Sequence, residues 1–326
     1  MNQQSDLKQR LSDEQGEVRA AALAELLQSG ADVLPYINEV TARIGDPMES
    51  VRLMALQLLA KTGAPAAEYF TLALSRQQTD GFRAVAAAML AAMGPPPMGV
   101  VRGLCRCLIS MDATLRNAAT VSLAKIGATA VPSLRLVLPT SSPEAVAAAV
   151  DALAMIGRSA EAAGPELQSL AVNSPLQLQL ACAAALSRVT GDPERGLPVL
   201  VNALENRDPL IRKTAIEKMA LLGAAAHPAT PQLLRCTADP DESVRVAAVL
   251  TLGRIQAPHA QVVPGIAARM GDPDGEVRYA AAVVLAGYGA RARPALVILQ
   301  TCLQDPLEKV ARCVAGAIKM IESSNT

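Results

Sequence analysis

The sequence predicts an all-α fold, a right-handed α-solenoid (superhelix) of about ten stacked helical hairpins. Two observations carry this prediction. Hydrophobic residues make up 51% of the 326 residues, yet aromatics make up only 2% and there is no Trp, so the core is filled by Ala and Leu, which suit closely packed helices. In addition, one motif recurs every 30 to 33 residues along the chain.

The repeat is clearest in a column of mostly arginine residues. The column runs through Arg19, Arg52, Arg83, Arg116, Val146, Gln179, Arg212, Arg245, Arg278 and Ala311. Seven residues after it stands an apolar residue in every unit: Leu26, Leu59, Leu90, Leu123, Leu153, Leu186, Met219, Leu252, Leu285 and Ile318. Three residues after it stands a small residue in nearly every unit, such as Ala22, Ala248 or Ala281. These spacings form one helical stripe, which predicts the second helix of each unit.

Glycine and proline mark the ends of these helices. A Gly recurs eleven residues after the arginine column, at Gly30, Gly63, Gly94, Gly127, Gly157, Gly223 and Gly289, where a helix would end in a left-handed residue. Prolines 33 residues apart, at Pro132, Pro165, Pro198, Pro231 and Pro264, predict the first turn of a first helix. We therefore expect a single solenoid domain over 1–326, regular in 1–80 and 197–322 and degenerate in 81–196.

Aspartate precedes several of the arginines by six residues, in Asp13/Arg19, Asp46/Arg52, Asp239/Arg245 and Asp272/Arg278. We expect each Asp to cap the second helix of its own unit, and each Arg to reach back toward such carboxylates. Repeated in register, these pairs would form a structural Asp/Arg ladder along the turns.

Units such as DPDESVRVAAVLTLGRI and GDPDGEVRYAAAVVLAGYG resemble the HEAT-like repeat family, in its short bacterial type of about 33 residues. The resemblance covers essentially the whole chain and implies the solenoid fold. Departures lie in the middle, where Val146 and Gln179 replace Arg and where GPPPMG at 94–99, SSPE at 141–144 and NSP at 173–175 rewrite the connections. A local change of curvature, a contact site or simple drift could each account for them.

No catalytic motif is visible in the sequence. The two histidines, His227 and His259, fall in neighbouring units without a Cys or carboxylate at ligand spacing, so we expect no metal. GYGARA at 287–292 matches a dinucleotide fingerprint in letters but joins two helices, and DPDGE at 272–276 lacks the spacing of a calcium loop. The six cysteines are expected to be reduced and mostly buried. We expect neither cofactor nor enzymatic activity.

The leading functional hypothesis is a non-enzymatic scaffold or adaptor that binds another protein on a concave face lined by the second helices. Residues one, five and nine places after the arginine column should face away from the core. The candidate partner-binding residues are Lys213, Leu250, Arg254, Tyr279 and Val283. Leu180 and Val246 lie at equivalent positions, and any of the apolar ones could instead pack against neighbouring helices.

An alternative follows from the resemblance, because proteins with short HEAT-like repeats include subunits of bilin lyases. An enzyme-assisting role of that kind stays open.

Thirty basic and thirty acidic residues give no net charge, which argues against nucleic acid as a partner. The N-terminal residues resemble no secretory signal and no apolar run is long enough for a membrane span, so we expect a cytoplasmic protein. Polar residues at both ends favour a monomer.

Overall fold

The computed structural model describes residues 3–75, 77–93, 97–140 and 142–324. Within these ranges every regular element is an α-helix or a short 3-10 helix, and no strand is present. The all-α prediction is therefore confirmed. The helices group into two compact units, Met1–Glu166 and Leu167–Thr326, which contain five helical hairpins each.

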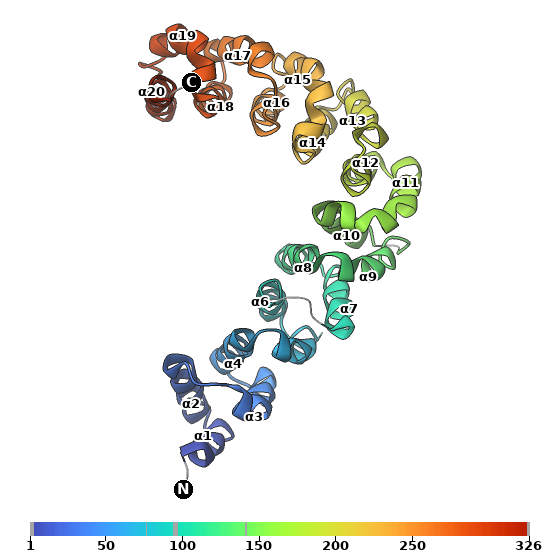
Figure 1. Cartoon of the computed structure of the whole chain (residues 1–326), viewed down its shortest axis with the longest axis vertical. Coiled ribbons are helices and arrows are strands. Elements are labelled where there is room, and N and C mark those ends of the chain that lie inside the picture. Colours follow the sequence, from blue (N-terminus) through green and yellow to red (C-terminus); the bar gives the residue numbers. More distant parts are fainter. Residues whose placement is uncertain (1–2, 76, 94–96, 141, 325–326) are drawn as a thin grey trace. The chain divides into compact units, whose positions relative to one another are not determined.

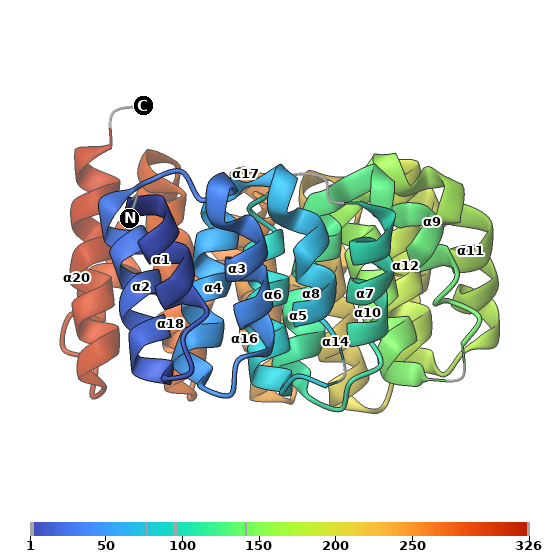
Figure 2. The same cartoon turned by 90° about the horizontal axis from the view of Figure 1, so that it is seen from below.

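The first unit pairs odd-numbered first helices with even-numbered second helices (Figure 1). Its helices are α1 (Gln3–Leu11), α2 (Gly16–Ser29), α3 (Ile37–Ala42), α4 (Glu49–Thr62), α5 (Phe70–Ala73), α6 (Asp80–Leu90), α7 (Met98–Cys107), α8 (Ala113–Ile126), α9 (Val131–Arg135) and α10 (Pro143–Ile156). Each second helix packs against the next one, from α2 through to α10, with the helix axes side by side (Figure 2).

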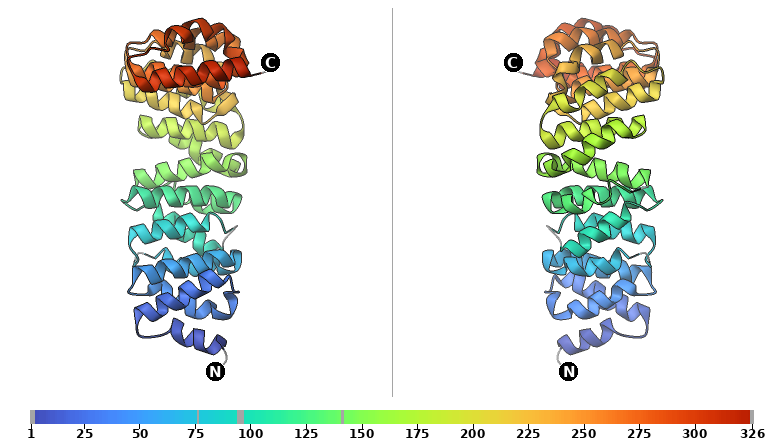
Figure 3. Two further views of the ribbon diagram at one scale, coloured as in Figure 1. Left: turned by 90° about the vertical axis from the view of Figure 1, so that its left-hand side faces the viewer. Right: turned by 90° about the vertical axis from the view of Figure 1, so that its right-hand side faces the viewer.

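The second unit repeats this arrangement (Figure 3). It contains most of α11 (Gly164–Asn173), then α12 (Leu176–Thr190), α13 (Leu197–Ala203), α14 (Pro209–Ala220), α15 (Thr230–Cys236), α16 (Glu242–Arg254), α17 (His259–Ala268), α18 (Gly275–Gly287), α19 (Leu296–Thr301) and α20 (Glu308–Ser323). Within this unit the second helices α12 to α20 line the inner side of an arc, and the first helices lie outside (Figure 1).

The core follows the columns that the sequence predicts. All ten residues three places after the arginine column are fully buried: Ala22, Ala55, Ala86, Ala119, Ala149, Cys182, Ala215, Ala248, Ala281 and Val314. The apolar column seven places after it is buried from Leu26 to Leu285, but Ile318 in α20 is only partly buried. The last helix packs against a neighbour on one side only, and it buries Ala317 and Ile321 instead.

The glycine column ends the second helices as expected. Gly30, Gly63, Gly127, Gly157, Gly223 and Gly289 all have positive φ angles, between 52° and 75°, whereas Gly94 lies outside the described residues. Such angles carry little penalty for Gly but clash with a Cβ. The eighth unit departs from the rule, because Gln256 takes this place with a φ of 53°.

The proline column differs from the prediction at one position. Pro132, Pro198 and Pro231 lie in the first turns of α9, α13 and α15. Pro264 lies inside α17 instead, because that helix begins five residues earlier, at His259, directly after Pro258.

In the degenerate units other contacts replace the arginine. Val146 is buried in the core, and Gln179 donates from Nε2 to the carbonyls of Val172 and Ser174 at 3.1 and 2.9 Å. Ser142 caps α10 by accepting from the amide of Ala145. Residues 94–96 of GPPPMG and residue 141 of SSPE lie outside the described residues.

Truncation of the buried apolar column should be costly. Leu252→Ala removes a fully buried side chain of α16 and should lower the free energy of unfolding by about 2 to 5 kcal/mol. Leu250→Ala, two residues away and 44% exposed, should change it by less than about 1 kcal/mol. Urea denaturation followed by circular dichroism measures both, and equal losses for the two variants would contradict this assignment of faces.

Candidate protein-binding surface

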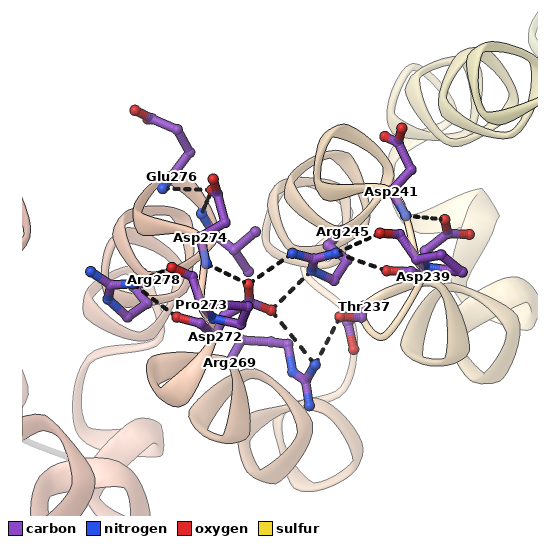
Figure 4. A network of polar contacts seen from close by, with 12 residues as sticks. Thr237, Asp239, Asp241, Arg245, Arg269, Asp272, Pro273, Asp274, Glu276 and Arg278 are labelled. Atoms are coloured by element: carbon purple, nitrogen blue, oxygen red, sulfur yellow. Dashed lines mark hydrogen bonds and ion pairs between the residues drawn. The ribbon is translucent and has the colours of Figure 1, made fainter.

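A repeated arginine contact fixes how neighbouring second helices lie. Arg245 donates from Nη1 to the carbonyls of Asp239 and Pro240, at 2.9 and 3.1 Å, which ties the Arg to the turn before its own helix. Its Nε and Nη2 atoms donate to the two carboxylate oxygens of Asp272 in the next unit, both at 2.9 Å (Figure 4). One guanidinium therefore joins two successive hairpins with four hydrogen bonds. The planar, branched guanidinium of Arg can donate such a set, whereas the ammonium of Lys cannot.

The same contact recurs at three further junctions. Arg19 binds Asp46 at 2.6 and 2.8 Å, Arg212 binds Asp239 at 2.8 and 2.6 Å, and Arg278 binds Asp305 at 2.7 and 2.9 Å. Each pair is 27 residues apart, and each aspartate is almost completely buried at its side chain. We call this set of contacts the inter-repeat ladder.

The expected role of the aspartates as helix caps is wrong. The carboxylate of Asp239 accepts from the amide of Asp241 at 2.9 Å and so closes the turn, while Asp241 caps α16 by accepting from Ser243 and Val244. Likewise Asp272 closes a turn and Asp274 caps α18 (Figure 4). The Arg that binds each carboxylate comes from the preceding unit, 27 residues earlier in the sequence.

Two predicted ladder residues occupy the places where the contact is incomplete. Asp13 lies in the first unit, and its carboxylate accepts from the amide of Gln15 without an Arg partner among the described residues. Arg52 donates to the carbonyls of Asp46 and Pro47, but Thr79 stands where its carboxylate partner would be. The Arg52 guanidinium lies 5.5 Å from the centroid of the Phe82 ring instead.

The second helices α14, α16 and α18 carry the five predicted partner-binding residues. Lys213 is half-buried on α14, Leu250 and Arg254 are exposed on α16, and Tyr279 and Val283 are exposed on α18. Leu180 lies at the equivalent position of α12, but it is fully buried in the core and is not part of the exposed face. This is the alternative of packing against neighbouring helices.

Two adjoining hollows lie on this face. The first, here called the basic pocket, has a volume of about 440 Å³ and is lined by Leu250, Gly253, Arg254, Gln256, Ala257, Pro258, His259, Val283, Val284, Gly287, Tyr288 and Arg291. The second, here called the acidic groove, has a volume of about 610 Å³ and is lined by Lys213, Glu217, Ala220, Glu242, Ser243, Val246, Ala247, Leu250, Thr251, Arg254, Asp274 and Glu276. Leu250 and Arg254 line both hollows.

The structure brings four of the five predicted residues to these hollows, since Lys213, Leu250, Arg254 and Val283 line one or both. Tyr279 lines neither of them. Its ring lies on the side of α18 toward α20, where the ammonium of Lys309 is 5.7 Å from the ring centroid.

The sequence reasoning missed several residues that the structure places here or in the ladder. Asp305 was missed because its own unit has Ala311 in the arginine column, although the 27-residue spacing from Arg278 would have revealed it. Tyr288 and Arg291 were missed because they follow Gly287 and lie outside the positions one, five and nine places after the arginine column. The available clue was Gly287, which stands where most other units carry a long side chain.

Comparison with known proteins agrees with this geometry. A model of HEAT repeats matches residues 230–319, which hold α16, α18, α20 and their ladder contacts. Residues 230–319 of this chain therefore match HEAT repeats. No curated protein matches the sequence.

Two solved structures with TM-scores above 0.5 share the fold of this chain, and a third has a lower score. Kap121p bound to Nup53p is 12% identical over 97% of this chain and 41% of its own, with a TM-score of 0.59. Kap95p, in a structure with RanGDP, is 16% identical over 98% of this chain and 44% of its own, with a TM-score of 0.55. The complex of CpcE and CpcF of phycocyanin lyase from Nostoc sp. PCC7120 is 24% identical over 71% of this chain and 92% of that chain, with a TM-score of 0.43.

Several chemically reactive side chains are engaged or buried, although His259 is exposed. His227 Nε2 lies 2.8 Å from the carbonyl of Ile255, and burial raises the pKa of the Cys105 thiol to about 12 and of Cys236 to about 11. Among the described residues no three His, Cys, Asp or Glu side chains gather as metal ligands. In the same ranges no helix is long and apolar enough to span a bilayer.

Loss of a ladder arginine should weaken the fold. Arg245→Ala leaves the Asp272 carboxylate, whose side chain is only 2% exposed, without its two strongest donors. The free energy of unfolding should fall by about 2 to 4 kcal/mol. Arg254→Ala is the control, because Arg254 is exposed and should change stability by less than about 0.5 kcal/mol. An unchanged midpoint of thermal unfolding in Arg245→Ala would contradict a structural role for the ladder.

The ladder also predicts how stability changes in acid. Hydrogen bonds from Arg278 hold the pKa of the Asp305 carboxyl below its usual value. Because the folded-state pKa is the lower one, this stabilisation is complete above the unfolded-state pKa of about 3.9 and is lost as the pH falls through the folded-state pKa. Arg278→Ala should therefore lose less stability than the unsubstituted protein between about pH 5 and pH 2. Parallel losses of the two proteins across denaturation curves at each pH would refute this linkage.

Proposed function

We propose that this protein is a non-enzymatic scaffold or adaptor, and that it binds a segment of another protein on the second-helix face of α14, α16 and α18. The observation that carries the proposal is the pair of adjoining hollows on one face, which share Leu250 and Arg254. Their volumes suit several side chains of a bound segment.

The residues of this face favour a protein as the ligand. Leu250, Tyr279 and Val283 are 44%, 39% and 40% exposed although they are large and apolar. Exposed apolar anchors with Arg at their margin are typical of protein interfaces, and Tyr and Arg often contribute most of the binding energy.

The ladder supports the proposal because it holds the face in place before a partner arrives. Arg212, Arg245 and Arg278 join the turns that precede α14, α16 and α18 to the units that follow them. A surface that is already ordered loses little conformational entropy on binding, so more of the contact energy appears as affinity.

The similar solved structures agree with a protein partner by analogy of fold. Kap121p was solved bound to Nup53p and bound to Ste12p, so a solenoid of similar fold can bind other proteins. The bacterial cytoplasm and the monomeric state, both expected from the sequence, stay predictions.

The alternative is an enzyme-assisting subunit of the bilin-lyase kind. It predicts that incubation with a bilin changes the visible absorption spectrum of the pigment. The scaffold proposal predicts an unchanged spectrum and no acceleration of bilin attachment to an acceptor protein.

Site-specific photo-crosslinking tests the binding face directly. Benzoylphenylalanine at Val283 on α18 should capture a discrete partner in cells, whereas the same probe at Val297 on α19 should not. Val297 is the matched control, because it is also an exposed valine, at 75%, but lies on a first helix. Capture of the same partner only from position 297 would place the interface on the opposite face.

Side-chain truncation tests the energetics of the captured complex. Tyr279→Ala and Arg254→Ala should each weaken binding by about 1 to 2 kcal/mol or more, measured by calorimetry, and both variants should keep their melting temperature. If the double variant binds the captured partner as before, this face is not the site, and the degenerate units in 81–196 become the next candidates.

A further inference from the structure

The basic pocket exists because a side chain is missing from the binding face. Gly287 stands nine residues after the arginine column, where most other second helices carry long side chains: Gln28, Lys61, Lys125, Met155, Arg188, Leu221, Arg254 and Met320. A Cβ on Gly287 would meet no heavy atom within 4 Å. The space that those side chains fill elsewhere is open here, and Gly287 lines it.

The rim of the pocket is held by an unusual turn. Gln256 adopts a φ of 53° where six other units have a Gly of positive φ, and the amide of Ala257 donates to the carbonyl of Leu252 at 3.0 Å to close the turn. The Tyr288 hydroxyl donates to the carbonyl of Ala257 at 2.8 Å. A non-glycine residue in this conformation costs roughly 1 to 2 kcal/mol, and the surrounding contacts keep it in place.

The charges of the two hollows are opposite. Arg254 and Arg291 line the basic pocket, and neither has an ion-pair partner among the described residues. No acidic side chain lines this pocket, and His259 lines it together with the two arginines. In the acidic groove, Glu217, Glu242, Asp274 and Glu276 outnumber Lys213 and the shared Arg254.

Arg254 and Arg291 differ in this from Arg212, Arg245 and Arg278, which the ladder pairs with carboxylates. Two exposed cations beside an apolar floor of Leu250, Val283 and Val284 attract an anion and can bind a carboxylate with paired hydrogen bonds. The acidic groove offers the complementary attraction for a Lys or Arg side chain. Leu250 lies between the two and offers an apolar contact.

From this arrangement we propose that the partner is an extended peptide segment in which an Asp or Glu, an apolar residue and a Lys or Arg follow one another. The acidic side chain occupies the basic pocket, the apolar residue covers Leu250, and the basic side chain occupies the acidic groove. This inference rests on the proposed function and adds to it the chemistry of the bound segment.

Selection from a random peptide library displayed on phage, with the purified full-length protein as bait, tests the segment. Enriched peptides should contain an acidic and a basic residue on either side of an apolar one. With Arg254→Glu/Arg291→Glu as bait, the preference at the acidic position should reverse, and with Glu217→Lys/Glu242→Lys the preference at the basic position should reverse. A peptide enriched by the unsubstituted protein should bind the arginine variant at least about tenfold more weakly.

Gly287→Met tests the pocket without changing any charge. Met occupies the equivalent position in α10 and α20, so the fold should accept it, and its side chain should fill the basic pocket. The variant should keep its melting temperature and lose the preference for the acidic residue while it keeps the preference for the basic one. Arg158→Glu, an exposed charge reversal in the other unit, should change neither preference.

The proposal is overturned if no peptide is enriched, or if the charge pattern stays the same in the arginine and Gly287→Met variants. Failure here leaves the proposed function standing if crosslinking from Val283 still captures a partner. If that crosslinking fails while peptides of this pattern are enriched, the inferred chemistry of the bound segment stands. The proposed function then fails, because the ligand would be a free peptide and not a segment of a protein partner.

Discussion

The bidentate contact between an Arg of one repeat and an Asp of the next is the interaction on which this structure depends. Asp239, Asp272 and Asp305 each accept two hydrogen bonds from the preceding Arg while also closing their own turn through a backbone amide. Because the guanidinium also binds two carbonyls of its own turn, each contact fixes both the distance and the register between two hairpins. Small residues such as Ala248 and Ala281 then allow the second helices to pack closely.

The same contact explains why charge can act as a recognition feature on the binding face. Each Arg of the ladder is paired with an Asp whose side chain is almost completely buried. The ladder therefore contributes little electrostatic field at the protein surface. Arg254 and Arg291 lie outside it, and with Gly287 they shape a basic pocket beside an acidic groove. Where the ladder is incomplete, as at Arg52 and Thr79 in the other unit, a contact with the Phe82 ring replaces it.

Periodicity made the fold predictable, because a residue type that recurs every 33 residues must meet the same surroundings in each hairpin. The buried column through Leu252 and the positive φ angles at Gly63 and Gly223 follow directly from it. The pairing partner of Arg245 did not follow, since the sequence places Asp239 and Asp272 in equivalent positions and only the stacking direction separates them. The basic pocket was also beyond prediction, because it depends on the absence of a side chain at Gly287, and Leu180 shows that an equivalent position can be buried by its local neighbours.

A double-mutant cycle tests the inter-repeat ladder most directly. Arg245→Ala and Asp272→Ala, alone and together, should give a coupling energy of about 1 to 3 kcal/mol from urea denaturation, because the two side chains contact each other. The matched cycle of Arg245→Ala with Asp239→Ala should give a coupling near zero, because Arg245 binds only the backbone carbonyl of Asp239. A large coupling to Asp239 with none to Asp272 would contradict the account and place the ion pair within a single repeat.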